Sequence, residues 1–159
     1  MTEGHYLRQL DDQMGRAEYD MYRAIPAEEV GMENPQHHMT YDEWRDWLAG
    51  EIAQNKYVTY IMYLRDYPIG HITIAFDEDI EDGNLSQVVR PVCRGSGLGK
   101  IMLKLAIEEA RKLGVKKLVG YAREFNVASW KMMEACGFTF IEETYYGSKH
   151  YELDLEEEK

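Results

Sequence analysis

The fold is decided by the stretch QVVRPVCRGSGLGKIMLKLAIEEARKL, which spans residues 87–113. It begins with β-branched residues of the kind found in buried strands. Pro91 cannot donate to a ladder, so it marks where strand pairing stops. A basic loop follows in which every second residue is a glycine: Gly95, Gly97 and Gly99. Because glycine leaves the backbone open to a ligand and allows positive φ angles, the stretch predicts a strand, a tight binding loop and then a helix.

The helix is expected to run from Leu98 to a stop at Gly114, because glycine commonly ends helices. Its apolar residues recur three or four positions apart and form one stripe, made of Leu98, Met102, Leu105, Ala106, Ala110 and Leu113. The first N–H groups of a helix have no acceptor within the helix, and here they lie beside the charges of Arg94 and Lys100. This combination predicts an anion site, most naturally for phosphate.

Two familiar phosphate-binding patterns do not fit the loop. A Walker loop needs a glycine where Arg94 stands and a hydroxyl residue where Ile101 stands. A dinucleotide fingerprint, G-x-G-x-x-G, finds no glycine at its last position in either register. An ordinary glycine-rich turn that binds no ligand remains the other interpretation.

The composition predicts one globular domain over residues 1–159, with an acidic tail at 156–159. Hydrophobic residues make up 45% of the chain and aromatic residues 12%, which is enough to bury a core. The net charge of −11 argues against nucleic acid and anionic membranes as partners, because both are bound by basic surfaces. The same acidity suits a cationic second substrate such as an amine, and it equally serves solubility.

The sequence contains no apolar run of membrane length and no signal-peptide core. Its two cysteines, Cys93 and Cys136, fit no zinc or redox spacing and are expected to be free thiols, which favours the cytoplasm. The adjacent His37 and His38 lack the further ligands that a metal site needs, so no metal is predicted. We expect a monomer or a homodimer.

Local signals outline the remaining elements. Asp11 or Asp12 is expected to cap the first helix, and Thr40 forms a capping box with Glu43 for the second. Asn126 is expected to cap the last, short helix. We expect strands over residues 6–10, 57–65, 69–76, 84–90, 117–122, 139–145 and 150–155, and helices over 12–23, 40–54, 98–113 and 126–136. The strand–helix–strand unit in the middle has the length of a right-handed crossover, which predicts one parallel strand pair.

Two separated patterns in the chain resemble the GNAT superfamily of N-acetyltransferases. Arg94-x-x-Gly97-x-Gly99, directly after Val-Arg-Pro, resembles motif A of that family. Asn126-x-x-Ser129, followed by a short helix and Cys-Gly-Phe, is similar to its motif B. The resemblance covers nearly the whole chain. It implies an α/β (α+β) fold with a mixed sheet of six to seven strands, splayed between the fourth and fifth strands and flanked by about four helices.

The resemblance also implies a site for acetyl-CoA, the co-substrate of the family. Its pantetheine would pair with the backbone of Gln87, Val88 and Val89, much as an added strand does. Asn126 and Ser129 would lie near the pantetheine and the adenosine, although a helix cap is the other interpretation of Asn126. The pyrophosphate would be held by the loop residues Arg94, Gly95, Ser96, Gly97, Leu98, Gly99 and Lys100.

The resemblance leaves the catalytic residues undefined. Many members place a tyrosine general acid seven residues after the motif B asparagine, and here that position is Met133, whose thioether has no proton to donate. Transfer in the family is direct, so Cys93 and Cys136 are expected to be bystanders. Candidates for the acid are Tyr121, Tyr145 and Tyr146, and candidates for the base are Glu124 and His71.

We therefore expect an N-acetyltransferase that moves an acetyl group from acetyl-CoA to the primary amine of a small molecule or a peptide. The alternative is a GNAT-fold module that binds acyl-CoA without catalysis. Met133 suggests it, because this residue stands where many members have the tyrosine general acid. A nucleotide-binding domain that uses the same glycine loop is the third possibility.

Overall fold

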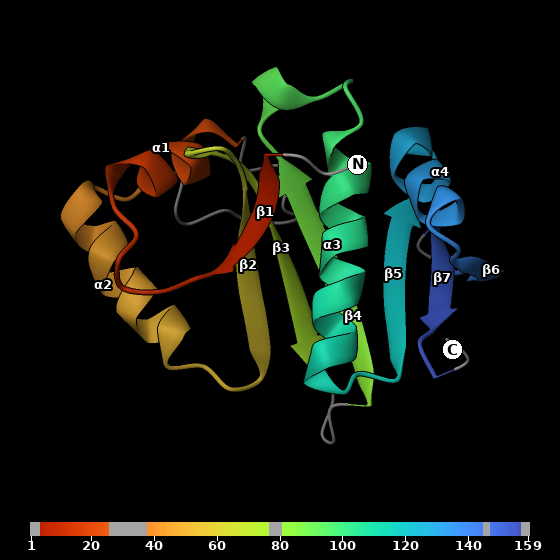
Figure 1. Cartoon of the computed structure of the whole chain (residues 1–159). Coiled ribbons are helices and arrows are strands. Elements are labelled where there is room, and N and C mark those ends of the chain that lie inside the picture. Colours follow the sequence, from red (N-terminus) through yellow and green to blue (C-terminus); the bar gives the residue numbers. More distant parts are fainter. Residues whose placement is uncertain (1–3, 26–37, 77–80, 145–146, 157–159) are drawn as a thin grey trace.

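Seven strands form one mixed sheet in the order β1-β2-β3-β4-β5-β7-β6 (Figure 1). The computed structural model describes residues 4–25, 38–76, 81–144 and 147–156. The strands are β1 (His5–Gln9), β2 (Tyr57–Leu64), β3 (Tyr67–Phe76), β4 (Asp82–Val89), β5 (Lys117–Arg123), β6 (Thr139–Glu143) and β7 (Ser148–Asp154). The α-helices of the described residues are α1 (Arg16–Ala24), α2 (Tyr41–Ile52), α3 (Leu98–Leu113) and α4 (Val127–Ala135). The predicted fold class is confirmed.

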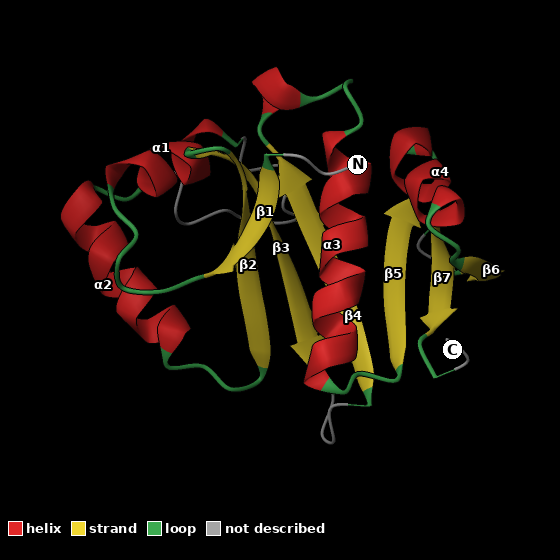
Figure 2. Ribbon diagram, viewed as in Figure 1, coloured by secondary structure: helices red, strands yellow, loops and turns green. Residues whose placement is uncertain are grey.

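Helices pack on both faces of the sheet, as Figure 2 shows. Successive residues of β2 point to opposite faces and enter different cores. Tyr60 and Met62 pack in the cluster that contains α3, whereas Ile61 and Tyr63 pack in the cluster that contains α1 and α2. Helix α4 packs against β5 and β7. None of the helices in the described part of the chain combines the length and apolarity needed to span a lipid bilayer.

Strands β4 and β5 are the parallel pair that the crossover predicts. They pair over a short segment only and then diverge. Their register contains only the pairs Asp82↔Lys117, Gly83↔Leu118 and Asn84↔Val119. Beyond these pairs, residues 85–89 of β4 and 120–123 of β5 have no partner on the other strand among the described residues. The predicted splay between the fourth and fifth strands is therefore confirmed, and it places free backbone edges opposite one another.

Helix α1 begins later than predicted, and neither Asp11 nor Asp12 caps it. Its start is held by Glu18, whose carboxylate accepts hydrogen bonds from the Gly15 N–H at 2.8 Å and from the Tyr63 hydroxyl at 2.6 Å. Asp11 instead accepts from a backbone N–H in the preceding turn. The prediction was wrong because the start is held by Glu18, in the first turn of the helix, through a local hydrogen bond from Gly15, while Tyr63 of β2 fixes the same carboxylate.

Helix α3 buries the centre of the predicted stripe and two residues beside it. Met102, Ala106 and Ala110 of the stripe are buried. Leu103 and Ile107, which lay outside the stripe, are buried as well, whereas Leu113 is 41% exposed. The helix packs on β1, β3 and β4 and also against α4, so its buried face is wider than the spacing of apolar residues predicted.

Two of the predicted local signals, a capping box and a glycine stop, are confirmed. The Thr40 hydroxyl accepts from the Glu43 N–H at 3.2 Å and begins α2. Gly114 ends α3 with a φ of 86°, a left-handed conformation that favours glycine. The last two strands differ from the prediction at their ends, because β6 already ends at Glu143 and β7 already begins at Ser148.

Gly70 lets β3 approach the part of β4 that borders the splay. A Cβ atom on Gly70 would lie 2.5 Å from the Val88 carbonyl oxygen and 3.0 Å from the Val89 Cα. Both neighbours are backbone atoms, which cannot move aside as a flexible side chain could. The position therefore requires glycine.

Gly70→Ala is expected to lower the free energy of unfolding by about 1–3 kcal/mol, because the added methyl group forces two paired strands apart. Gly50→Ala is the matched control, since Gly50 lies in α2 and a Cβ atom there would meet nothing within 4 Å beyond the helix's own backbone. It is expected to raise the free energy of unfolding by up to about 1 kcal/mol, because alanine is the better helix former. Urea unfolding measures both, and equal effects of the two substitutions would contradict the assigned role of Gly70.

Candidate functional site

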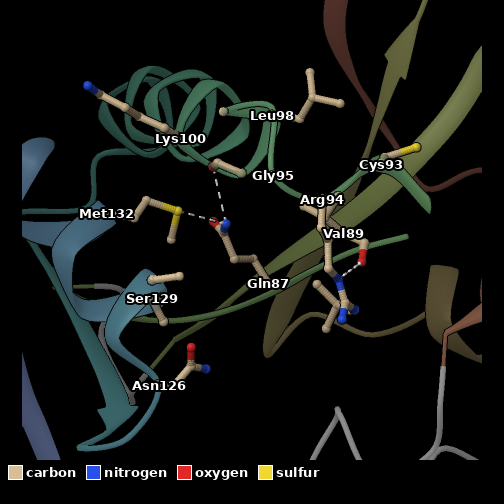
Figure 3. Close-up of a pocket in the computed structure, with 14 residues that line it drawn as sticks. Gln87, Val89, Cys93, Arg94, Gly95, Leu98, Lys100, Asn126, Ser129 and Met132 are labelled. Atoms are coloured by element: carbon tan, nitrogen blue, oxygen red, sulfur yellow. Dashed lines mark hydrogen bonds between the residues drawn. The ribbon is translucent and has the colours of Figure 1, made fainter. Parts of the chain in front are cut away.

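A cavity of about 450 Å³ lies where β4 and β5 have parted, between the first turns of α3 and α4 (Figure 3). It contains all but one of the residues predicted to hold the cofactor. The exception is Ser96, whose hydroxyl donates to the Cys93 carbonyl at 3.2 Å. The lining consists of Gln87, Val88, Val89, Cys93, Arg94, Gly95, Gly97, Leu98, Gly99, Lys100, Asn126, Ala128, Ser129 and Met132.

The turn that leads into α3 presents a row of free backbone donors. The first N–H of the helix to find a backbone acceptor is that of Ile101, which donates to the Gly97 carbonyl at 3.2 Å. In the described structure, the N–H groups of residues 95–100 donate to no acceptor. Gly95 and Gly97 have φ angles of 88° and 81°, as predicted for glycines of this turn. Free N–H groups at a helix N-terminus attract anions.

Two cationic side chains flank these donors, and both are exposed. The Arg94 Nε donates to the Val89 carbonyl at 2.8 Å, which ties the turn to the end of β4 (Figure 3). Lys100 lies in the first turn of α3, which contains no acidic residue. The turn is therefore electropositive although the chain as a whole carries a net charge of −11.

Helix α4 contributes the opposite wall of the cavity. Asn126 stands at the N-cap position, but its side chain makes no capping hydrogen bond, so the predicted side-chain cap is wrong. Its backbone carbonyl instead accepts from the Ser129 N–H at 3.1 Å. Figure 3 shows Asn126 and Ser129 on one side of the cavity, across from the turn that begins α3.

The lining includes three residues that the sequence analysis did not assign to the site: Cys93, Ala128 and Met132. Met132 follows Ser129 by three positions on α4, so helical spacing places both on one face and could have identified it. The next residue, Met133, points into the core instead. It is 4% exposed, and its sulfur would lie 2.6 Å from a Cβ atom on Gly120.

None of the described candidates for acid–base catalysis lines the cavity. Glu124 is exposed in the turn before α4, where its carbonyl accepts from the Trp130 indole N–H at 3.1 Å. Tyr121 is 53% exposed and stacks on His150 at 4.8 Å between ring centroids. Tyr145 and Tyr146 lie outside the described residues. The roles assigned to these side chains stay predictions.

His71 lies on β3 within the aromatic packing of α1 rather than in the cavity. Its ring stacks on Tyr22 with 4.8 Å between centroids, and its Nδ1 is buried without a hydrogen-bond partner in the described structure. Burial lowers the pKa of His71 to about 4, because a charged imidazolium loses its hydration there. The ring is therefore neutral at physiological pH.

His71 is expected to make the protein less stable in acid. Its folded pKa lies below the ordinary value of 6.5, so the unfolded chain takes up the proton first as the pH falls. Stability from the neutral ring is complete above about pH 6.5 and is lost toward pH 4, by about 2–3 kcal/mol. Replacing His71 by phenylalanine keeps a stacking ring and should flatten the urea-unfolding midpoints over this range. An unchanged pH dependence would show that His71 is not the group responsible.

Comparison with known proteins identifies the family. The profile of the acetyltransferase (GNAT) family matches residues 18–138, which is more than half of the chain. The chain therefore belongs to this family and is an acetyltransferase by that membership. A search of curated protein sequences finds no match.

Solved structures of low sequence identity share the fold. The spermidine N-acetyltransferase of Vibrio cholerae, in complex with CoA and spermine, has a TM-score of 0.78 at 15% identity and covers 97% of both chains. RimL, a ribosomal L7/L12 α-N-protein acetyltransferase in complex with coenzyme A, has a TM-score of 0.78 at 17% identity over 95% of this chain and 94% of its own. A GNAT-family acetyltransferase from Streptococcus pneumoniae has a TM-score of 0.73 at 17% identity over 94% and 98%.

Proposed function

We propose that this protein transfers an acetyl group from acetyl-CoA to a primary amine. The observation that carries the proposal is the row of free N–H groups over residues 95–100, which opens into a cavity of about 450 Å³ beside two cationic side chains. Diphosphate is the part of acetyl-CoA that such a row binds best. Family membership supplies the reaction class.

In this proposal, the turn from Arg94 to Lys100 binds the pyrophosphate and β4 aligns the pantetheine. Residues 85–89 of β4 have backbone groups that β5 leaves unpaired in the described structure. An extended pantetheine with two amides can pair with such an edge as an added strand would. Asn126 and Ser129 lie on the far wall, where their side chains can contact the same ligand.

The reaction needs a neutral amine, a polarised thioester carbonyl and a protonated or stabilised leaving thiolate. The amine nitrogen attacks the carbonyl carbon, the new C–N bond forms, and the C–S bond breaks to release the CoA thiolate. The nitrogen loses one proton as it becomes an amide, and the thiolate takes up one proton to leave as the free thiol. A free N–H at the end of β4, near Val89, is positioned to stabilise the oxyanion. The direct route needs no cysteine nucleophile, so the thiol of Cys93 serves only as part of the lining.

We infer that the acceptor is an amine of a small molecule or a peptide, and that a cationic acceptor is favoured. The chain carries a net charge of −11 although its cofactor turn is basic, so the remaining surface attracts cations. Two relatives of the same fold agree with this chemical class, since one is a spermidine N-acetyltransferase and the other an α-N-protein acetyltransferase.

Lys100→Glu is expected to weaken the binding of CoA about tenfold, because it places a negative charge beside the proposed pyrophosphate position. Lys104→Glu is the matched control. It makes the same change in charge one helical turn further along α3, on an exposed side chain outside the cavity lining. Isothermal titration calorimetry with CoA measures both variants. If both variants weaken CoA binding equally, only the net charge of the protein affects binding, and the proposed position of the pyrophosphate is wrong.

Turnover is the direct test of the reaction. The protein is incubated with acetyl-CoA and a panel of amines that includes polyamines, amino acids and peptide N-termini, and the release of free CoA thiol is recorded. We expect thiol release that depends on one class of amine and falls in the Lys100→Glu variant. CoA binding without release for any amine would contradict the proposed reaction while leaving the binding site intact.

A further inference from the structure

The side chain of Gln87 joins three elements at the floor of the cavity. It extends from β4, three residues beyond the last residue of that strand that pairs with β5. Its Nε2 lies 3.2 Å from the Gly99 carbonyl oxygen in the first turn of α3 and 3.4 Å from the Met132 sulfur of α4. Figure 3 shows both contacts as dashed lines that converge on this one nitrogen. Gly99 lies close to both side chains, since a Cβ atom there would lie 3.4 Å from the Gln87 Nε2 and 3.3 Å from the Met132 sulfur.

The contact to Gly99 acts on a donor of the anion site. The Gly99 carbonyl and the Lys100 N–H belong to one planar peptide unit and point in opposite directions. This peptide lies in the first turn of α3, whose geometry sets the direction of the N–H, and a hydrogen bond that holds the carbonyl restrains that direction further. The Lys100 N–H is one of the free donors of residues 95–100 in the described structure.

The other end of the Gln87 amide makes no hydrogen bond in the described structure that would add to stability. Its Oε1 is buried and has no hydrogen-bond partner in the described structure, and a buried acceptor without a donor is unfavourable. A methionine of similar length would fill the same space without this penalty. Stability of the cavity floor therefore does not account for a glutamine at this position, whereas its effect on the Gly99–Lys100 peptide does.

We propose that Gln87 is a positioning residue for the diphosphate, which holds the Gly99–Lys100 peptide so that the Lys100 N–H points into the anion site. The inference rests on the proposed function, because it assumes that a diphosphate occupies this turn. It adds a role for the side chain of Gln87 to the backbone pairing proposed for β4. The side chain of Gln87 is proposed to affect the binding of the diphosphate of the ligand and not that of its pantetheine.

Gln87→Met tests the proposal, with Asn84→Ala as the control on the same strand, since Asn84 is exposed, lies outside the cavity lining and still pairs with β5. Calorimetric titration is carried out with CoA and with ADP, which carries a diphosphate but no pantetheine. We expect Gln87→Met to weaken both ligands by the same factor, about five- to tenfold. We also expect its thermal unfolding midpoint without ligand to be equal to or above that of the unchanged protein, and Asn84→Ala to change neither.

Three results would overturn the inference. Unchanged binding of both ligands would mean that the peptide keeps its direction without Gln87. A loss confined to CoA would mean that the side chain contacts pantetheine directly. A lower unfolding midpoint together with weaker binding would make the residue a structural support of the cavity. Failure of the unchanged protein to bind CoA is a separate outcome, which overturns the proposed function itself.

Discussion

The divergence of β4 from β5 after a short paired segment is the constraint on which the rest of the structure depends. The two strands are held parallel by three residue pairs, and the crossover through α3 fixes their direction. Once they part, backbone groups that a continuous sheet would satisfy face an open space instead. The protein compensates on the other side of β4, where Gly70 lets β3 approach within contact distance of Val88 and Val89. One edge of β4 is therefore firmly held while the other is free for a ligand.

In the proposed anion site, backbone N–H groups contribute more to binding than charged side chains do. Arg94 and Lys100 are exposed, and exposed charges interact weakly in water. The N–H groups of residues 95–100 are instead directed by a turn whose positive φ angles at Gly95 and Gly97 only glycine adopts at little cost. Such donors are already oriented before a ligand arrives, so little conformational entropy is lost on binding. This explains how an acidic protein can bind an anionic ligand.

None of the described candidates for proton transfer lines the cavity. Met133 is buried against β5, and Glu124 and Tyr121 lie away from the cavity. The thiolate of CoA is a good leaving group, so alignment of the thioester and polarisation of its carbonyl supply much of what the reaction requires. In the proposed function, the cavity orients acetyl-CoA through backbone donors with support from the Gln87 amide, and such an arrangement suits that kind of catalysis.

The sequence by itself determined the features that act over a few residues: the glycine turn before α3, the capping box of Thr40 and Glu43, the stop at Gly114 and the parallel crossover. It also located nearly all of the cavity lining, because the two motifs carry those residues. Only the tertiary structure decided which distant residue fixes Glu18 at the start of α1, that α3 also buries Leu103 and Ile107, and what the Gln87 side chain contacts. These depend on contacts between residues far apart in the chain, such as that of Glu18 with Tyr63, and no local pattern records which distant partner a side chain will meet.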